Sequence, residues 1–458
     1  MSQQRDQLRQ LDKEALIETV VLLRARLATL EKRVAELEGK VRMARPDKTP
    51  ENSSIPSSQG WKAKRVKKAQ AKRGPKVGHI GKSRQRSVPD EIIECRVGIC
   101  QQCGQDLSME SQQAVDSRQV VDIPPIRPQV REARRYGATC PSCGQYQVGA
   151  YPTEFETGRL LGPHLETLVV YLHHAHPLSY QRVQHILRDM LDTAVSMGVL
   201  VNTVKRSAVR LQQATANIQF QIQQATVVGS DETGVRVGGE NHWQWVFQTP
   251  CWVFMHIHRR RAATVIQAVM GDAHPLVWVS DLGSAQLGHP AMALQVCLAH
   301  QVRDLQYVVD THRCAWGYRL QALFYRALRL GKHRNALPPD VYRRQVAAVE
   351  QALDDLLAQF PNNADSQRLR ERYRKHCSSL FVFLRRPDVP PTNNASEQAL
   401  RNSVIYRKVT GGFRTTWGAS VYANLISILE TARRQGRQSF ATLSAILAGY
   451  PVFVPLRE

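Results

Sequence analysis

The segment VVGSDETGVRV, residues 227–237, decides the fold, because it places two acids inside a strand-like apolar run. Asp231 and Glu232 interrupt that run. A buried carboxylate is costly unless something pairs with it, so a salt bridge, a helix cap or a metal ion must explain the pair. Neighbouring side chains of a strand point to opposite faces. We therefore expect Asp231 and Glu232 to face different sites, with Thr233 on the face of Asp231.

Strand-like segments continue beyond this run. Three of them combine aromatic and β-branched residues over the length of a strand: residues 242–249, 251–258 and 275–281. Residues 259–271 read as a helix between the last two. Residues 294–309 read as a fifth strand that enters a helix, and residues 312–390 are almost wholly helical in pattern. The sequence thus predicts an α/β core with a mixed sheet and a large α-helical insertion.

Two more acids occur where they could join Asp231 at one site. Asp281 ends the fourth predicted strand, and Glu397 lies in NNASEQALR, residues 393–401. If Asn394 caps this helix, Glu397 is the third helical residue and nearly completes a capping box, which is the purely structural alternative. In the functional alternative, Glu397 projects from its helix toward the two strand acids.

Three carboxylates at one point repel each other unless cations compensate them. Hard oxygen ligands suit Mg²⁺ or Mn²⁺, and two such ions roughly 4 Å apart would clamp the attacking and leaving oxygens of a phosphodiester. We therefore predict two Mg²⁺ or Mn²⁺ ions at Asp231, Asp281 and Glu397. Helical spacing puts Arg401 and Lys408 on the face of Glu397, where they suit phosphate binding.

The composition points to a polyanionic partner. The 458 residues include 62 Lys and Arg against 39 Asp and Glu, which gives a formal net charge of +23. Nucleic acid is the commonest partner of so basic a chain, although an anionic membrane surface would also attract it. No apolar run is long enough to span a bilayer, and MSQQRDQLRQ lacks the apolar centre of a secretory signal. We therefore expect an intracellular protein, cytoplasmic and nucleoid-associated, without a membrane partner.

A heptad repeat runs through residues 13–43. One core position holds Leu16, Leu23, Leu30 and Leu37, and the other holds Val20, Leu27, Val34 and Val41. β-branched residues at one position with Leu at the other favour a parallel two-stranded coiled coil. We therefore expect residues 1–45 to pair two chains in a homo-oligomer, most simply a dimer. The alternative is an amphipathic helix that packs on its own chain.

Residues 46–90 read as a Ser- and Pro-containing linker followed by a basic arm. The arm from Lys62 to Arg86 carries eleven Lys or Arg residues, and no Asp or Glu occurs from Asn52 to Pro89. A long run that carries only positive charges is typical of a nucleic-acid-binding arm. The alternative is a solvated flexible tail. Its binding would be salt-sensitive and largely blind to sequence. The residues expected to bind are Lys62, Lys64, Arg65, Lys67, Lys68, Lys72, Arg73 and Lys76.

Two C-x-x-C pairs lie in residues 91–150. They are Cys100 with Cys103 and Cys140 with Cys143, and each pair is followed by Gly, which allows the tight turn of a zinc knuckle. Four thiolates can close one tetrahedral structural zinc site, so we predict a zinc-ribbon-like domain. A redox pair is the weaker alternative, since it would not need two copies. We expect Cys95 to be a bystander, and ordinary buried residues at Cys251, Cys297, Cys314 and Cys377.

The remaining boundaries follow from changes of period. Residues 151–224 are helical in pattern and form either a DNA-binding domain or a connector. Their three histidines, His173, His174 and His176, could suggest a metal, but a helical surface is the favoured interpretation. Residues 225–430 then form the core, with its insertion at about 312–390, and residues 431–458 form a C-terminal helical tail.

Taken together, these motifs resemble the DDE transposases of the insertion-sequence-sixty-six family. The resemblance rests on DET in the first strand, WVSD at the end of the fourth, and NNASEQALR followed by RK. It extends to NSSIPSS, to DIPPIRP with CPSCG, and to GPHLETLVVYL with LSYQRV, so it covers nearly the whole chain. The resemblance implies an RNase H-like catalytic core with a helical insertion. It also implies that Asp231, Asp281 and Glu397 are the catalytic triad.

An enzyme of this family would cut double-stranded DNA at transposon ends and join the new 3′ ends to target DNA. The competing hypothesis is a DNA-binding regulator or a retired transposase, in which the coiled coil and zinc ribbon bind DNA and the core is only a scaffold. The three acids at the expected places favour the enzyme, because a degenerate copy would be expected to lose at least one of them.

Overall fold

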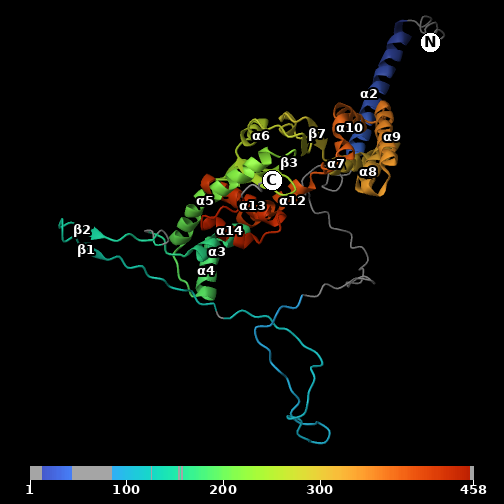
Figure 1. Ribbon diagram of the computed structural model, residues 1–458. Coiled ribbons are helices and arrows are strands. Elements are labelled where there is room, and N and C mark those ends of the chain that lie inside the picture. Colours follow the sequence, from blue (N-terminus) through green and yellow to red (C-terminus); the bar gives the residue numbers. More distant parts are fainter. Residues whose placement is uncertain (1–12, 44–84, 125, 153–154, 156–157, 454–458) are drawn as a thin grey trace. The chain divides into compact units, whose positions relative to one another are not determined.

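The computed structural model describes residues 13–43, 85–124, 126–152, 155 and 158–453 (Figure 1). The chain divides into two compact units. One comprises residues 1–61, 153–183 and 197–458, and the other comprises residues 62–152 and 184–196. Within the described residues, no helix has both the length and the apolar character that crossing a membrane requires. The basic arm at 62–84 lies outside the described residues.

A five-stranded mixed sheet forms the centre of the first unit. Its strands, in the order in which they pair, are β5 (Val253–His258), β4 (Glu240–Gln248), β3 (Val227–Val237), β6 (Val277–Ser280) and β7 (Ala293–Val296). The first three strands along the chain are antiparallel, whereas β3, β6 and β7 pair in parallel. All five predicted strands are therefore confirmed. The first and fourth are neighbours.

The turn between β3 and β4 has a local cause. Val237 pairs with Glu240, so only Gly238 and Gly239 connect the strands. Both have positive φ, 58° and 83°, which is the backbone of the two-residue hairpin turn that suits twisted strands. This tight turn fixes the register of β4 against β3, and with it the residues that face Asp231.

Three helices cover one face of the sheet. α12 (Asn394–Thr410) packs on β3 and β4, while α13 (Thr416–Arg434) packs on β5 and on α5 (Met197–Gln223). α13 also covers the sheet edge, because Ser427 Oγ accepts a hydrogen bond from Met255 N at 2.8 Å, and Thr431 Oγ1 accepts one from Val253 N at 3.0 Å. An edge strand covered in this way is protected from pairing with another chain.

The helical insertion shares one hydrophobic core with the sheet. Its helices are α7 (Leu298–His312), α8 (Ala315–Lys332), α9 (Pro339–Ala358), α10 (Ala364–Lys375) and α11 (Val382–Arg385). Short 3-10 turns occur at Gln286–Gly288, Arg334–Ala336 and Cys377–Ser379. The buried rings of Trp316, Phe324 and Tyr373 belong to the same cluster as Val279 of β6 and Val296 of β7. The insertion therefore supports the end of β6 that leads to Asp281.

The region before the sheet is helical, as expected. It contains α3 (Pro163–Val170), a π-helical turn at Tyr171–Ala175, α4 (Tyr180–Leu191) and α5, and α6 (Ala263–Met270) follows β5. His174, in the π-helical turn, is 3% exposed and lies within 6.5 Å of the ring of Tyr406 and 6.1 Å of that of Tyr422. The favoured interpretation of the three histidines as a helical surface is therefore wrong for His174, because aromatic residues of α12 and α13 cover it.

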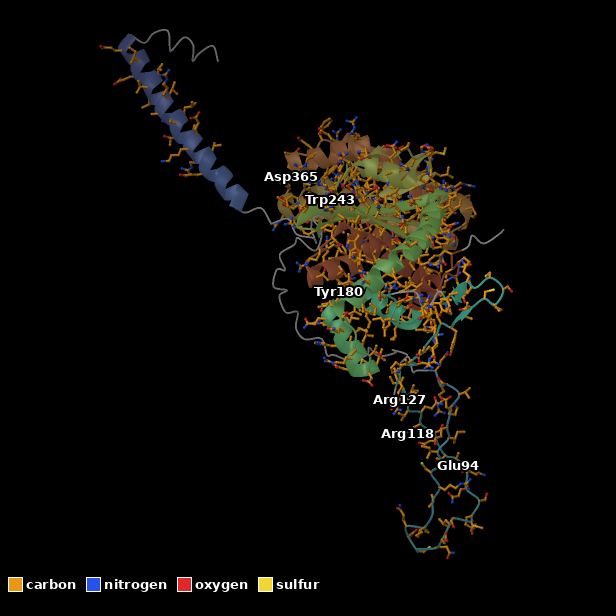
Figure 2. The ribbon with its side chains drawn as sticks, turned by 90° about the vertical axis from the view of Figure 1, so that its left-hand side faces the viewer. Glu94, Arg118, Arg127, Tyr180, Trp243 and Asp365 are labelled. Atoms are coloured by element: carbon orange, nitrogen blue, oxygen red, sulfur yellow. The ribbon has the colours of Figure 1, made fainter. Side chains whose placement is uncertain are left out.

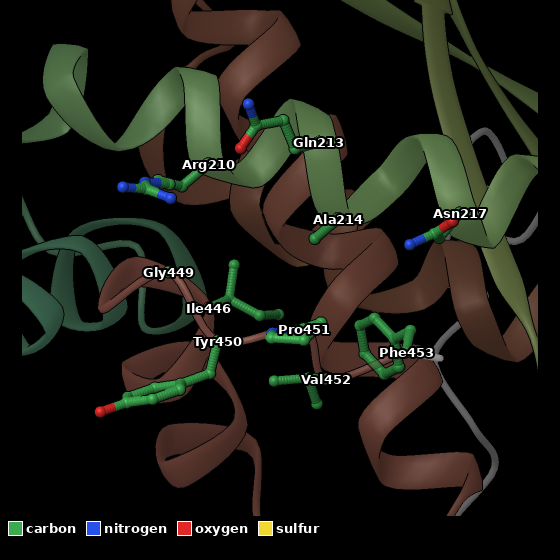
Figure 3. A pocket seen from close by; sticks show the side chains of 10 residues that line it. All are labelled: Arg210, Gln213, Ala214, Asn217, Ile446, Gly449, Tyr450, Pro451, Val452 and Phe453. Carbon is green, nitrogen blue, oxygen red and sulfur yellow. The ribbon is translucent and has the colours of Figure 1, made fainter. Parts of the chain in front are cut away.

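The C-terminal segment returns to α5. After α14 (Ser439–Leu447), residues 449–453 and α5 line a cavity of about 180 Å³, with Arg210, Gln213 and Asn217 on the α5 side (Figure 3). α13 crosses the boundary that we expected between residues 430 and 431. The core thus continues to Arg434 without a break.

The N-terminal segment Lys13–Met43 forms one helix, α2. The described members of its heptad stripe are exposed by 47% to 62%: Val20, Leu23, Leu27, Leu30 and Val34. Ile17, Val21 and Leu22 are also exposed, so the apolar surface is wider than the stripe. The described members of the stripe therefore remain exposed to solvent.

Residues 85–152 of the second unit have little regular structure where they are described. Their strands β1 (Gly137–Thr139) and β2 (Tyr146–Val148) form one hairpin. In this described part no residue is buried, and five are partly buried: Cys100, Leu107, Gln112, Ala133 and Cys140. Figure 2 shows side chains such as Arg118 and Arg127 projecting outward from an extended chain. The described part of residues 85–152 therefore lacks a hydrophobic core of its own, whereas residues 184–196 of the same unit include most of α4, with Leu187 buried.

Candidate active site and zinc-binding segment

Parallel pairing of β3 with β6 sets the positions of the two aspartates. Val227 pairs with Val277, Val228 with Trp278 and Gly229 with Val279. The two residues of each pair are 50 positions apart, and so are Asp231 and Asp281. The same register, continued by two residues beyond Gly229 and Val279, therefore brings Asp231 and Asp281 side by side. Asp281 lies just beyond β6, where its Oδ1 accepts a hydrogen bond from Gly283 N at 2.9 Å.

The two acids of the DET segment have different contacts. The Glu232 side chain is 1% exposed and forms an ion pair with Arg261 at 2.8 Å. Gln286 Nε2 donates to its second oxygen at 2.5 Å. Burial is the main cause that raises the pKa of Glu232, while the bonds to Gln286 and Arg261 oppose the rise. A salt bridge therefore explains Glu232, and it leaves Asp231 to be explained.

Asp231 is partly buried and lies beside like charges. Its Oδ1 accepts a hydrogen bond from Glu232 N at 2.9 Å, and no Lys or Arg of the described residues forms an ion pair with it. Burial raises the pKa of Asp231 well above its usual value, and the charges of Asp281, Glu232 and Glu397 raise it further. A buried carboxylate facing two others fits a site for hard divalent cations, which would remove this repulsion.

Glu397 enters this site from α12, and the capping-box alternative is wrong. The N-cap of α12 is Asn393 and not Asn394, so Glu397 is the fourth helical residue. Its carboxylate is 39% exposed and faces α7, where Oε1 lies 3.6 Å from His300 Nε2 and 3.4 Å from Arg303 Nη2. The carboxylate therefore contacts α7 and does not form the capping-box bond that the sequence suggested.

Asn393 connects the three parts of the candidate site. It is 1% exposed, and its Nδ2 donates to Ser230 O, next to Asp231, at 2.7 Å. Its backbone N donates to Cys297 Sγ at 3.1 Å, and its Oδ1 accepts from Ser396 Oγ at 2.6 Å. Asn393 thus ties the start of α12, which carries Glu397, both to β3 and to the start of α7.

We predict that Asn393→Ala slows metal-dependent DNA cleavage by on the order of 100-fold, because a shift of about 1 Å in a reacting group costs that much. The Mg²⁺ concentration that gives the half-maximal rate should rise as well. The measurement is the cleavage rate against Mg²⁺ concentration, with the exposed neighbour Asn394→Ala as the matched control. If the Mg²⁺ dependence is unchanged, Asn393 has only a structural role.

Cations approach the acids from two helices. Arg407 of α12 is half-buried and donates to Thr233 Oγ1 at 3.1 Å, on the strand face of Asp231, and Arg303 of α7 reaches Glu397. Sequence analysis did not single out either arginine. It proposed Arg401 and Lys408 instead, and both are exposed on α12. Their role in phosphate binding stays a prediction.

Sequence analysis gave Cys297 only as an ordinary buried cysteine and assigned no role to His300. Cys297 is fully buried and lies, with His300, beside Glu397. The expectation of an ordinary buried cysteine is thus incomplete for Cys297, and it is wrong for Cys251, which is exposed. The short spacing of Cys297 and His300 at the end of a predicted strand was the available signal.

The two C-x-x-C pairs form equivalent turns. In each, the first Cys N donates to the O atom five residues later, at 2.8 Å for Cys100 and 2.9 Å for Cys140. The glycine after each pair, Gly104 or Gly144, has positive φ and donates to the first Cys O. Hydrogen bonds from backbone N–H groups lower the pKa of Cys100 and Cys140.

The four knuckle thiols are not gathered within ligand distance of one another. In the described part of the chain, the group that meets this criterion is Cys297, His300 and Glu397. Convergence of Cys100, Cys103, Cys140 and Cys143 on one ion therefore stays a prediction.

The described cavities lie apart from the three acids. The larger one has a volume of about 600 Å³ and is lined by residues of β3, α8, α12 and the segment before α12, but not by Asp231, Asp281 or Glu397.

Comparisons with known proteins add two matches to family models. The model described as "Transposase IS66 family" matches residues 158–421, which is more than half of the chain and includes all three acids. The model described as "zinc-finger binding domain of transposase IS66" matches residues 98–144, which include all four knuckle cysteines. Among curated proteins, the uncharacterized protein y4jO of Sinorhizobium fredii is 29% identical over 163 residues. That match covers 36% of this chain and 44% of the relative, so it spans less than half of the relative's length.

Proposed function

The chain belongs to the IS66 family of transposases, and from this premise we propose that it cleaves DNA at the ends of its mobile element and joins the freed 3′ ends to target DNA. The observation that carries the proposal is the meeting of Asp231, Asp281 and Glu397. The buried Asp231 carboxylate lies within the electrostatic reach of both others and lacks a cation among the described residues. Such a cluster is the arrangement that phosphodiester chemistry with two metal ions requires.

The side chains of the site have separate roles in this proposal. Asp231, Asp281 and Glu397 would hold Mg²⁺ or Mn²⁺, which when bound supplies activation of the attacking oxygen and stabilisation of charge on the phosphate. Arg303 contacts Glu397, and Arg407 contacts Thr233, two residues after Asp231. Both would orient the scissile phosphate, because a guanidinium matches the geometry of phosphate oxygens. Asn393 holds Glu397 in register with Asp231. The chain thus supplies preorganised positions for charges that develop during the reaction.

The topology supports an RNase H-like core. The order β5-β4-β3-β6-β7, with three antiparallel strands followed by two parallel ones, puts the first and fourth strands side by side. The insertion between β7 and α12 separates Glu397 from the two aspartates in sequence, and yet the structure returns Glu397 to the same sheet edge. We accordingly assign residues 225–430 as the catalytic core, with residues 151–224 as its helical connector.

An in vitro cleavage assay on the element's own ends tests this proposal. Purified protein should nick DNA that carries those ends in Mg²⁺ or Mn²⁺, and EDTA should abolish nicking. DNA of scrambled end sequence is the control for non-specific nuclease activity. Specific binding without metal-dependent cleavage would instead favour the alternative, a DNA-binding regulator or retired transposase.

We propose that the exposed stripe of α2 pairs two chains. Substitution of Leu23 and Leu30 by Asn should shift the protein to a smaller species in sedimentation, because each substitution puts an amide into the apolar seam. Lys32→Asn, on the outer side of the same helix, is the matched control and should leave the mass unchanged. An unaltered mass for the Leu23 and Leu30 variant would show that the helix does not join the chains.

The basic arm is proposed to bind DNA without sequence preference. Replacement of Lys67 and Lys68 by Gln should weaken binding to all DNA alike, and the slope of log affinity against log salt should fall by up to about 2, because each lost phosphate contact contributes about 0.9. Arg343 and Arg344, exposed on α9, are the matched pair for the same loss of charge. An unchanged slope in the Lys67 and Lys68 variant rejects the arm as a DNA contact.

A further inference from the structure

Cys297 and His300 lie at the start of α7, where Cys297 is the N-cap residue. Their spacing is C-x-x-H, so the two side chains are three positions apart. The backbone differs from that of the zinc knuckles, because Cys297 N donates to Ser280 O of β6 rather than within a tight turn. The cluster is therefore defined by its side chains and not by a knuckle backbone.

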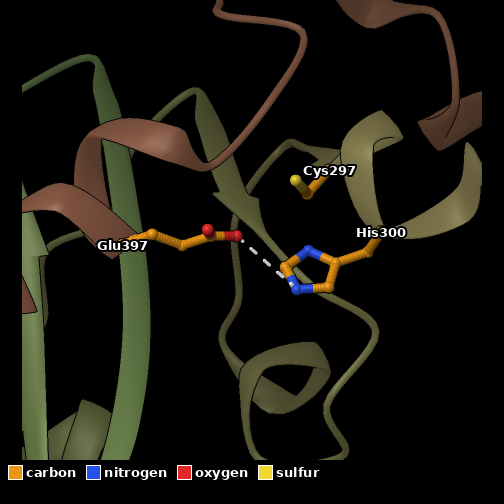
Figure 4. Close-up of side chains that lie close together, drawn as sticks. All are labelled: Cys297, His300 and Glu397. Atoms are coloured by element: carbon orange, nitrogen blue, oxygen red, sulfur yellow. Dashed lines mark ion pairs between the residues drawn. The ribbon is translucent and has the colours of Figure 1, made fainter. Parts of the chain in front are cut away.

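A third ligand faces this pair from another element. Figure 4 shows Glu397 of α12 pointing toward His300, with Cys297 beside them. One ligand atom from each of Cys297, His300 and Glu397 lies within 4.8 Å of the others. Glu397 Oε1 and His300 Nε2 are 3.6 Å apart. Tetrahedral zinc bonds place ligand atoms roughly 3.5 Å apart, so closure on one ion needs movements on the order of 1 Å.

The surroundings of the cluster suit a divalent cation. Burial and the guanidinium of Arg303 lower the pKa of His300, whereas the negative charges of Glu397, Asp281 and Asp304 oppose that shift. Asn393 N donates a further hydrogen bond to Cys297 Sγ, which is the kind of second contact that holds a metal-bound thiolate in place. The half-exposed Glu397 leaves the cluster open to solvent.

We propose that Cys297, His300 and Glu397 form a binding site for a zinc-class ion, separate from the zinc-ribbon cysteines, and that this ion competes with Mg²⁺ for Glu397. Sulfur and imidazole nitrogen are ligands that Zn²⁺ accepts and Mg²⁺ does not. Binding of the ion displaces the proton of the Cys297 thiol, as for any thiolate ligand. The proposed competition between this ion and Mg²⁺ rests on the proposed role of Glu397 in catalysis. The proposed binding of the ion to Cys297, His300 and Glu397 does not depend on that role.

The binding is tested with full-length protein and Zn²⁺ or Co²⁺ alone. After metal removal, the wild-type chain should take up one more ion than Cys297→Ser at the same metal concentration. The substitution should lower the affinity for that ion by on the order of 100-fold or more, as expected for loss of a ligand. Cys251→Ser, an exposed cysteine outside both sites, is the matched control. His300→Gln provides a second variant, and thermal melting identifies any variant that fails to fold. Equal uptake and equal Co²⁺–thiolate absorption in folded wild type and Cys297→Ser would overturn the site.

The competition between Zn²⁺ and Mg²⁺ is tested by DNA cleavage at a fixed Mg²⁺ concentration. For each protein, the cleavage rate with Zn²⁺ is divided by the rate of the same protein without Zn²⁺. Zn²⁺ should inhibit the wild type and Cys251→Ser, and excess Mg²⁺ should relieve the inhibition. Inhibition of the Cys297→Ser variant should need on the order of 100-fold more Zn²⁺. Equal inhibition of all three proteins refutes the competition. A chain that binds the ion at Cys297 but never cleaves DNA refutes the proposed function and leaves the metal site standing.

Discussion

Asp231→Asn is expected to abolish DNA cleavage and strand transfer while the protein stays folded. The carboxylate would hold metal ions that contribute several kcal/mol to the transition state, so the rate should fall by at least about 10³-fold. The metal-free variant should also melt at a higher temperature than the wild type, because Asn removes a buried charge that Asp281 and Glu397 repel. Cleavage assays and thermal melts in EDTA measure the two effects.

The neighbouring acid supplies the matched control. The Glu232 side chain is buried too, but it faces the other side of the sheet and pairs with Arg261. Glu232→Gln should therefore retain metal-dependent cleavage and lose stability by about 1–3 kcal/mol, the cost of weakening a buried hydrogen-bonded group. The opposite pattern, with cleavage lost in Glu232→Gln and kept in Asp231→Asn, would show that the face of the sheet was misassigned.

The other two acids complete the same test. Asp281→Asn and Glu397→Gln keep the shape of each side chain but remove a charged metal ligand, so each should lose cleavage as Asp231→Asn does. Glu397→Gln is informative because no capping bond of Glu397 holds the start of α12, whose N-cap is Asn393. Wild-type rates in any one of the three variants would remove that acid from the proposed triad.

The sheet was predictable because its signals are local. Alternation over residues 227–237 placed Asp231 and Glu232 on opposite faces, and the apolar segments around it have the length of buried strands. The order of the strands is not local in the same way. It followed from the resemblance to a family, and the parallel register of β3 with β6 became visible only in the structure.

The start of α12 shows why a local rule failed. A capping box looks only at residues three positions apart, and by that rule Asn394 was the natural N-cap. In the structure Asn393 takes that position because tertiary contacts hold it. It donates hydrogen bonds to Cys297, 96 residues away in sequence, and to Ser230, 163 residues away. No window along the sequence contains those partners. The same holds for Arg407, which meets Thr233 across 174 residues.

Burial was the other source of error. His174 lies in a helical segment with polar neighbours, which is typical of a surface, yet a π-helical turn and the rings of Tyr406 and Tyr422 enclose it. In the sequence Cys297 is one of several scattered cysteines, and only the structure shows that it lies beside His300 and Glu397. Residue type and spacing predict which side chains can do chemistry, whereas the structure decides which of them meet.

Residues 85–152 of the second unit are expected to depend on zinc for their fold. The described residues of 85–152 include no buried side chain, so burial of apolar surface contributes little to holding them together. A structural zinc ion contributes about 10–16 kcal/mol to the folding of small metal-binding domains. Removal of zinc should therefore open this segment while the sheet and its helices stay folded.

Protease sensitivity and zinc content measure this dependence. With zinc bound, Cys100, Cys103, Cys140 and Cys143 should hold the ends of the intervening segment together, so trypsin should cut slowly at arginines such as Arg118 and Arg135. Chelation or Cys140→Ser should remove one zinc ion per chain, make those cuts fast, and leave the melting temperature of the core unchanged. Cys95→Ser is the matched control, because Cys95 is exposed and lies outside both knuckles. If Cys95→Ser loses zinc as Cys140→Ser does, the ligand set must include Cys95; if Cys140→Ser keeps its zinc and its protection, the two knuckles do not share one ion.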